Sequence, residues 1–442
     1  MAARTCTWLL ALLAVGTDAS ALGDDTTIWK NYHVPIAIVG TPLLYNAETE
    51  EELMHEGCPG CAKALVFVGS NDRQVYAMMQ NNGTIVWKRE LGSRAQPGPV
   101  MGRAGPWDGE GPRDVLVVSA ERGDVVGFDP LTGDQLWKSD LGGNCAAAPV
   151  LTPDRMVAYF SSGNRIVLVG VTNGHILGTI GVEVASGATL HATPLLVPIY
   201  EGGHNGGVGG EGDGGSADGS GVLDAAVVGW TLYVTTSVGG LSAFSVSASE
   251  PAELELLWRY DTKEYLDFQT SPVISEGRVF LGGYSKILHA LNASTGELLW
   301  QFHTTDVVPT VAITPDKSRV VFGGSDRWVY SLAVEDGMMM WKNEFGYSVQ
   351  SPPVVRNDGS VVVTGTLPKE VKTEGKRGQT IRRGERVAAY SYTGRHLWGY
   401  GLDGTVHGSV AQSDDGCTVY FASNDGTVYR VGQCPVRAHD EL

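Results

Sequence analysis

The sequence lacks three features, and each absence narrows what the protein can be. Beyond its N-terminal stretch it contains no convincing amphipathic helix, which points away from a helical fold. It has no further long apolar run, so no membrane span is expected in the mature chain. It also has no excess of positive charge. The formal net charge of −17 argues against nucleic acid and anionic membranes as partners.

Common catalytic motifs are missing as well. The chain contains no Gly-x-Ser-x-Gly elbow, no His-Glu-x-x-His helix and no phosphate-binding loop. Its 10 His residues are scattered rather than grouped at the spacing of metal ligands, so no metal site is predicted.

What the sequence does contain is a repeated phrase: a short apolar strand, a turn ending in Gly, and Trp four residues after that Gly. The clearest copy is ILHALNASTGELLWQF at Ile287–Phe302. Successive marks at Trp258, Trp300 and Trp341 lie 42 and 41 residues apart, enough for the four short strands of one β-propeller blade. The remaining marks are Trp29, Trp87, Trp137 and Trp398, and Gly178 stands where one further Trp is expected.

The two ends of the chain complete each other. The last repeat has strands at Thr418–Ser423 and Thr427–Val431 but no Trp strand, and Thr27–Lys30 supplies one. Pairing the ends would remove the open edges of the ring. The sequence therefore predicts an all-β, eight-bladed propeller over residues 22–436, closed by the N-terminal strand. Because Gly178 leaves the third blade without its packing anchor, we expect the weakest contact between blades there.

The segments LHALNASTGELLW and VGFDPLTGDQLW resemble the signature of the pyrroloquinoline-quinone (PQQ)-like repeat propellers, of the quinoprotein alcohol dehydrogenase-like superfamily. The resemblance covers nearly the whole mature chain. That family includes dehydrogenases, a bacterial outer-membrane assembly lipoprotein and sensor domains of the endoplasmic reticulum (ER) lumen, so it implies the fold and leaves the activity open. The dehydrogenase activity, as the resemblance implies it, needs adjacent cysteines, calcium held by carboxylates and an Asp base. The chain has no Cys-Cys dipeptide, so PQQ with calcium is not expected and no cofactor is predicted.

Both ends carry address signals. Residues 1–21 read as a signal peptide, with Arg4, the apolar stretch Thr7–Val15 and the small residues Ala19–Ala21; an uncleaved anchor is the alternative. The chain ends in a tetrapeptide of the kind that an ER retrieval receptor reads: His439, Asp440, Glu441 and Leu442. Together the two signals predict the ER lumen.

Sequons and cysteines are consistent with that compartment. Asn82 and Asn292 open sequons on polar turns, where Asn also suits the turn itself. The mature chain has five cysteines. Cys417 and Cys434 flank the last hairpin and could staple the ring closure, while Cys58 and Cys61 could form a small structural disulfide, a redox pair, free thiols or half a metal site.

Two insertions stand out. The Gly-rich tract at residues 201–221 is expected to be a disordered loop. The basic segment at residues 367–386 separates the second and third strands of its blade, whereas the Gly-rich tract separates a first and a second strand. The two insertions should therefore emerge on opposite faces of the propeller. The basic segment could dock an acidic partner or a phosphate, or simply stay solvated.

Prolines mark the innermost strands, whose free edge faces the central channel. Three residues before each such Pro, or before the Val in its place, five positions carry side chains that can hydrogen-bond. We expect them to form a ring at the channel mouth, on the face of the basic insertion, binding a small polar ligand or ordered water. The five residues are Gln96, His191, Gln269, Gln350 and His407, with Val39, Ala146 and Val308 at the other three positions.

Two functional hypotheses remain. The first is a soluble, non-catalytic scaffold or sensor of the ER lumen that binds lumenal proteins or peptides. The alternative is a PQQ-type or other oxidoreductase, or a lyase, that acts on a small metabolite at the channel mouth.

Overall fold

The computed structural model describes the propeller strands and most of the loops between them. The described residues are 28–31, 41–46, 64–95, 97–105, 112–145, 147–182, 189–190, 192–200, 227–237, 239–247, 253–262, 270–366, 386–402, 404–413, 416, 418–424 and 426–432. No helix occurs among them, and therefore none that could cross a membrane.

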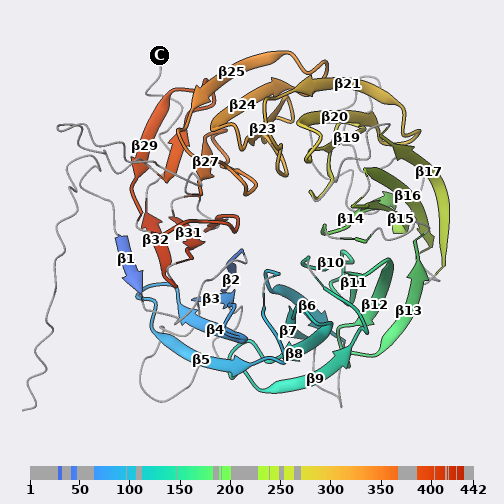
Figure 1. The fold of residues 1–442 in the computed structure, drawn as a ribbon. Helices are drawn as coiled ribbons and strands as arrows, with labels where there is room; N and C mark the ends of the chain where they lie inside the picture. The colour runs from blue at the N-terminus through green and yellow to red at the C-terminus, as the bar shows by residue number, and fades with distance from the viewer. Residues whose placement is uncertain are drawn as a thin grey trace, which may run out of the picture.

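The strands form eight sheets of four, arranged as the blades of a ring (Figure 1). Blade 1 contains β2 (Leu43–Asn46), β3 (Ala64–Gly69), β4 (Gln74–Met79) and β5 (Ile85–Glu90). Blade 2 contains β6 (Val100–Ala104), β7 (Arg113–Ser119), β8 (Asp124–Phe128) and β9 (Gln135–Asp140). Blade 3 contains β10 (Val150–Leu151), β11 (Val157–Ser162), β12 (Arg165–Gly170) and β13 (Ile176–Gly181). Blade 4 contains β14 (Leu195–Tyr200), β15 (Val227–Thr235), β16 (Gly240–Ser247) and β17 (Leu254–Asp261).

The second half of the ring repeats the pattern. Blade 5 contains β18 (Val273–Ser275), β19 (Arg278–Leu281), β20 (Ile287–Asn292) and β21 (Leu298–His303). Blade 6 contains β22 (Ala312–Ile313), β23 (Arg319–Gly323), β24 (Trp328–Ala333) and β25 (Met339–Glu344). Blade 7 contains β26 (Val354–Val355), β27 (Val361–Thr364), β28 (Val387–Tyr390) and β29 (His396–Tyr400). Blade 8 contains β30 (Ala411–Gln412), β31 (Thr418–Ala422), β32 (Val428–Gly432) and β1 (Ile28–Asn31).

Blade 8 closes the ring with strands from both ends of the chain. The N-terminal strand β1 pairs antiparallel with β32, with Ile28 opposite Val431 and Asn31 opposite Val428. In Figure 1, β1 lies on the outer side of β32, in the place that the fourth strand holds in the other blades. The predicted all-β, eight-bladed propeller with this closure is confirmed.

Each blade buries both of its faces, because alternate side chains of a strand point to opposite sides of the sheet. In β4, Val75 and Ala77 belong to the apolar cluster shared with blade 2, whereas Tyr76 and Met78 belong to the cluster shared with blade 8. One such cluster fills every interface between neighbouring blades, which we call a seam. This is why the middle strands read as nearly continuous apolar runs.

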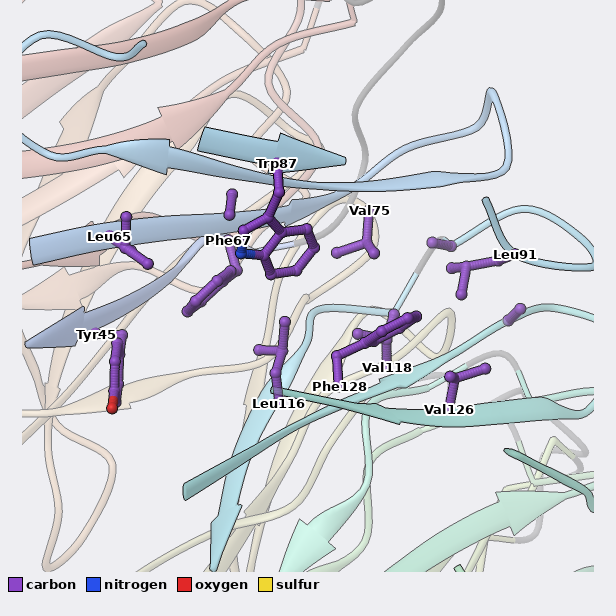
Figure 2. Packing of buried hydrophobic residues seen from close by; sticks show 13 residues of the cluster. Tyr45, Leu65, Phe67, Val75, Trp87, Leu91, Leu116, Val118, Val126 and Phe128 are labelled. Carbon is purple, nitrogen blue, oxygen red and sulfur yellow. The ribbon is translucent and has the colours of Figure 1, made fainter. Parts of the chain in front are cut away.

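The repeated Gly and Trp meet across the seams. Trp87 of β5 lies between Phe67 of its own blade and Phe128 of the next, with ring centroids 5.7 and 6.1 Å apart (Figure 2). Its indole Nε1 donates to the carbonyl of Pro130 at 3.0 Å. A Cβ on Gly133, where φ is +71°, would lie 2.5 Å from the Trp87 ring. Glycine is therefore required both by the backbone and by the neighbouring indole.

The same contact recurs at four more seams. In each, the indole nitrogen donates to a carbonyl of the next blade at 2.7–3.1 Å. The pairs are Trp137 with Val171, Trp258 with Ala293, Trp300 with Val334, and Trp341 with Tyr392.

The seam after blade 3 is filled differently. Gly178 stands in β13 where the other blades carry Trp, yet the cluster between blades 3 and 4 contains Trp230, which comes from β15 of the following blade and is 9% exposed. The strand register shows that Trp230 occupies the position that Asp114 holds in blade 2 and Ser318 holds in blade 6. The indole nitrogen of Trp230 has no hydrogen-bond partner among the described residues. An indole from the other side thus occupies this seam without the usual bond across it.

Replacing Gly174 by Ala should destabilise the protein more than replacing Gly163. Both glycines lie in blade 3 with φ of +72° and +60°. Each change costs about 1–2 kcal/mol for a left-handed non-glycine residue. Only the Gly174 Cβ would also collide with an indole, that of Trp137 at 2.5 Å, whereas Gly163 has open space. The collision should add roughly 1–3 kcal/mol. Urea denaturation of both variants measures the difference, and equal midpoints would contradict the role given to the contact.

Phe should replace Trp230 at a lower cost than it replaces Trp137. Both changes keep an aromatic ring, but only Trp137 Nε1 donates a hydrogen bond among the described residues, to the Val171 carbonyl at 2.7 Å. Losing that bond should cost about 1 kcal/mol more. Thermal unfolding of W137F and W230F tests this. The Trp230→Ala variant checks that the indole fills the seam. Its free energy of unfolding should fall by about 3–5 kcal/mol, because the change leaves a cavity.

Candidate functional site

One face of the propeller carries the loops from the fourth strand of each blade to the first strand of the next, together with the turns between second and third strands. We call it the ring face. A single backbone bond recurs there: the N–H of Glu121, in the turn of blade 2, donates to the Arg94 carbonyl of the preceding loop at 2.9 Å. Five other seams repeat it at 2.8–3.3 Å. The repeats join Gly163 to Asn144, Ser237 to Thr189, Ser325 to Val307, Thr366 to Ser348, and Asn424 to Thr405.

Two of the five predicted channel-mouth residues can be placed. Gln350 is exposed and His407 is half-buried, and they follow the fully buried Val349 and Val406 at equivalent points of their loops. Burial lowers the pKa of His407. Gln96, His191 and Gln269 lie outside the described residues, so the ring as a whole stays a prediction.

The position assigned to Val308 in this ring is wrong. Its N–H donates to the Gly283 carbonyl at 3.1 Å, as the N–H of Val349 donates to Gly324 at 3.1 Å. Val308 is fully buried and is therefore the counterpart of Val349. The loop that leads into the first strand of blade 6 is one residue shorter than the loop that leads into blade 7. Counting back three residues from the position before the first strand therefore reaches Val308 instead of the residue after it.

The other candidate residues are divided between described and undescribed parts of the chain. Asn82 is exposed and Asn292 is half-buried, and in each the side-chain Oδ1 accepts the N–H two residues later at 2.9 Å, which supports the turn. Glycosylation of either stays a prediction. Cys145 is buried between blades 2 and 3 with a free thiol whose pKa burial raises to about 11. Outside the described residues lie Cys58, Cys61, Cys417, Cys434, residues 1–21, 201–221, 367–385 and 439–442.

The ring face also contains a polar depression that the sequence did not suggest. It lies at the seam of blades 1 and 2 and has a volume of about 660 Å³. Its lining residues are Arg73, Gly92, Ser93, Arg94, Glu121, Arg122 and Asn144. Three guanidinium groups and one carboxylate give it a local excess of positive charge on a protein whose net charge is −17. The Asp124 carboxylate, paired with Lys138 at 2.9 Å, stands where a Cβ of Gly92 would collide with it.

The dehydrogenase resemblance implies a calcium ion held by carboxylates. No group of three or more His, Cys, Asp or Glu side chains in the described part of the chain could hold a metal ion. That PQQ with calcium is not bound stays a prediction, and we derive no step through such a cofactor.

A buried histidine lies at the seam of blades 4 and 5. His289 is 2% exposed, and its Nδ1 lies 3.1 Å from both the Tyr260 hydroxyl and Gln301 Nε2. Its place in β20 is held by Tyr76 in β4 and Tyr330 in β24, whose hydroxyls donate to turn aspartates. Burial, with the nearby charge of His303, lowers the pKa of His289 to about 4.

This histidine should make stability pH-dependent. In the unfolded chain its pKa is about 6.5 and in the fold about 4, so the unfolded state binds more protons between these values. The contribution of neutral His289 to the free energy of unfolding is complete above pH 6.5 and is lost as the pH falls toward 4. When the pH is lowered from 7 to 5, the free energy of unfolding should fall by about 2 kcal/mol more in the native protein than in the His289→Gln variant. Urea denaturation at both pH values measures this difference. The exposed His175, changed to Gln, is the control and should keep the native dependence.

Comparison with known proteins agrees with this architecture. Residues 17–198 and 178–365 match the family model described as outer membrane protein assembly factor BamB. A quinoprotein ethanol dehydrogenase of Pseudomonas aeruginosa is 26% identical over 188 residues, which are 37% of this chain and 30% of that protein. The chain thus aligns with less than a third of the length of this curated relative.

Solved structures show the fold alone. BamB of Moraxella catarrhalis superposes with a TM-score of 0.54 at 15% identity, covering 88% of this chain and 100% of that one. The computationally designed Ika8 protein superposes with a TM-score of 0.57 at 12% identity, covering 90% and 96%. Because the family model matches well over half of its residues, the chain belongs to the BamB-like family of PQQ-like repeat propellers.

Proposed function

We propose that this protein is a non-catalytic scaffold or sensor that binds proteins or peptides through its ring face. One observation carries the proposal. The same backbone bond holds six described loops, while the residue whose carbonyl accepts it changes from seam to seam: Arg94, Asn144, Thr189, Val307, Ser348 and Thr405. A fixed frame with changing side chains is the arrangement on which recognition surfaces are built. The family description, an assembly factor, supports the same class of function.

The proposed compartment is the ER lumen. Its support comes from the sequence: the signal peptide at residues 1–21 and the terminal His439–Leu442. The retrieval receptor would engage that terminus, and lumenal proteins or peptides would engage the ring face.

A second candidate is an oxidoreductase that uses a quinone. The observation in its favour is the 26% identity to a quinoprotein ethanol dehydrogenase, which extends over 37% of the chain. The shared repeats account for this similarity without shared chemistry, because the blade signature itself recurs along the chain.

A photocrosslinking probe on the ring face should form covalent adducts with lumenal proteins. Gln350 is exposed on that face, and Leu257 in β17 is 49% exposed on the outer rim. A photocrosslinking amino acid at position 350 of the mature chain should form discrete adducts in an ER lumenal extract, and the same probe at position 257 should not.

The crosslinking experiment needs two controls. The mature chain without residues 439–442 removes the retrieval receptor from the comparison. Titration with PQQ and Ca²⁺, followed by absorbance, tests the second candidate. Equal labelling at both positions, or adducts with general chaperones alone, would contradict the scaffold, and stoichiometric quinone binding would favour the enzyme.

A further inference from the structure

The depression between blades 1 and 2 is built on a fixed backbone. Leu91 and Ala95, both buried in the seam cluster of Figure 2, flank the segment that carries Arg94. The Leu91 N–H donates to the Arg73 carbonyl at 2.7 Å, and the Ala95 N–H to that of Ser70 at 3.2 Å. The loop that presents Arg94 is thus anchored at both of its ends to the turn that presents Arg73.

The turn of blade 2 is held to the same loop. The Arg122 N–H donates to the Ser93 hydroxyl at 3.0 Å, next to the bond from Glu121 to Arg94. The three arginines therefore start from backbone positions that hydrogen bonds fix relative to one another. Little ordering of the backbone would be needed for a ligand to meet them, which favours binding.

Comparison with the other seams shows whether the fold itself requires these arginines. In the five other described loops that make the same backbone bond, the position of Arg94 is held by an uncharged residue: Asn144, Thr189, Val307, Ser348 or Thr405. The position of Arg122 is held by Asn164 in blade 3 and Asp326 in blade 6. Since the same backbone forms without cations, the fold does not require Arg94 or Arg122.

Two of the three guanidinium groups, those of Arg94 and Arg122, have no ion pair with another described residue. Arg94 and Arg122 are exposed, and in the described part of the chain their side chains have neither an ion pair nor a hydrogen bond. Arg73 approaches Glu90 at 3.8 Å, with both side chains more than half exposed, so this pair is weak. Donors remain available for an external acceptor.

We propose that this depression binds an acidic peptide segment of a partner protein, through carboxylates held by Arg94 and Arg122. The inference rests on the proposed function and names the chemistry of its ligand. Guanidinium groups match carboxylates in charge and geometry. Glu121 in the lining opposes a compact phosphate dianion, but together with the exposed Asn144 it can accept or donate bonds to a peptide backbone.

Fluorescence anisotropy of the mature protein with two labelled peptides tests this inference. One peptide alternates Asp and Glu with Gly and Ser, and the other carries Asn and Gln in place of the acids. The acidic peptide should bind and the amide peptide should not. In the double variant Arg94→Gln, Arg122→Gln the dissociation constant should rise about ten-fold or more, because two charged hydrogen bonds are lost.

The matched control is the double variant Lys286→Gln, Arg327→Gln. Both residues are exposed on turns of the ring face in blades 5 and 6, outside the depression, and their removal changes the net charge by the same amount. It should bind the acidic peptide as the native protein does. Thermal unfolding of both double variants checks that the folds are equally stable.

Three outcomes would overturn the inference. They are equal loss of binding in both double variants, equal binding of the two peptides, and displacement of the acidic peptide by inorganic phosphate at lower concentration than by unlabelled peptide. The last outcome would indicate a small-anion site. If the acidic peptide fails while adducts from position 350 persist, this inference fails and the scaffold function stands.

Discussion

The contact between an indole and a glycine of the next blade is the interaction on which the ring depends. A four-stranded sheet has two apolar faces, and neither can stay in water. At five of the described seams the Trp of the outer strand reaches over the seam, and its ring takes the space that a Cβ on the facing glycine would need. Its nitrogen donates to a carbonyl of the neighbouring blade, as Trp87 does to Pro130 at 3.0 Å, so the buried polar groups satisfy each other. Burial and hydrogen bonding thereby hold neighbouring blades together, and with them the loops that these blades carry on the ring face.

The fold was predictable because this contact leaves a periodic trace. A glycine forced by a left-handed turn and a Trp four residues later are uncommon enough to be counted, and their period fixes the blade. The filling of the seam after Gly178 was not predictable. Trp230 lies on a second strand, where register alone reveals its equivalence to Asp114. Periodicity shows that an anchor is missing, but only packing shows what occupies its place.

The candidate site was predicted less well, for a physical reason. The sequence predicts channel-mouth positions at a fixed distance from the innermost strands, which holds only if the loops have constant length. Blade 6 breaks this condition, and Val308 proves to be a core residue. The arginine depression is not visible as a motif, because Arg73, Arg94 and Arg122 come from three separate segments of the chain. The recurring bond from turn to loop makes these positions comparable, and an alignment of the loops rather than of the strands would have singled out Arg94.

Closure by β1 also has a consequence for the order of synthesis. Ile28 is paired with Val431, so the first strand of the structure to be made waits for nearly the last before it finds its partner. Until then, seven blades can stack in sequence while the apolar face of blade 1 that packs against blade 8 remains uncovered. A pairing across almost the entire chain is slow to form, because the loop it closes is long. Pairing of β1 with β32, rather than formation of any single blade, is then the step that closes the ring.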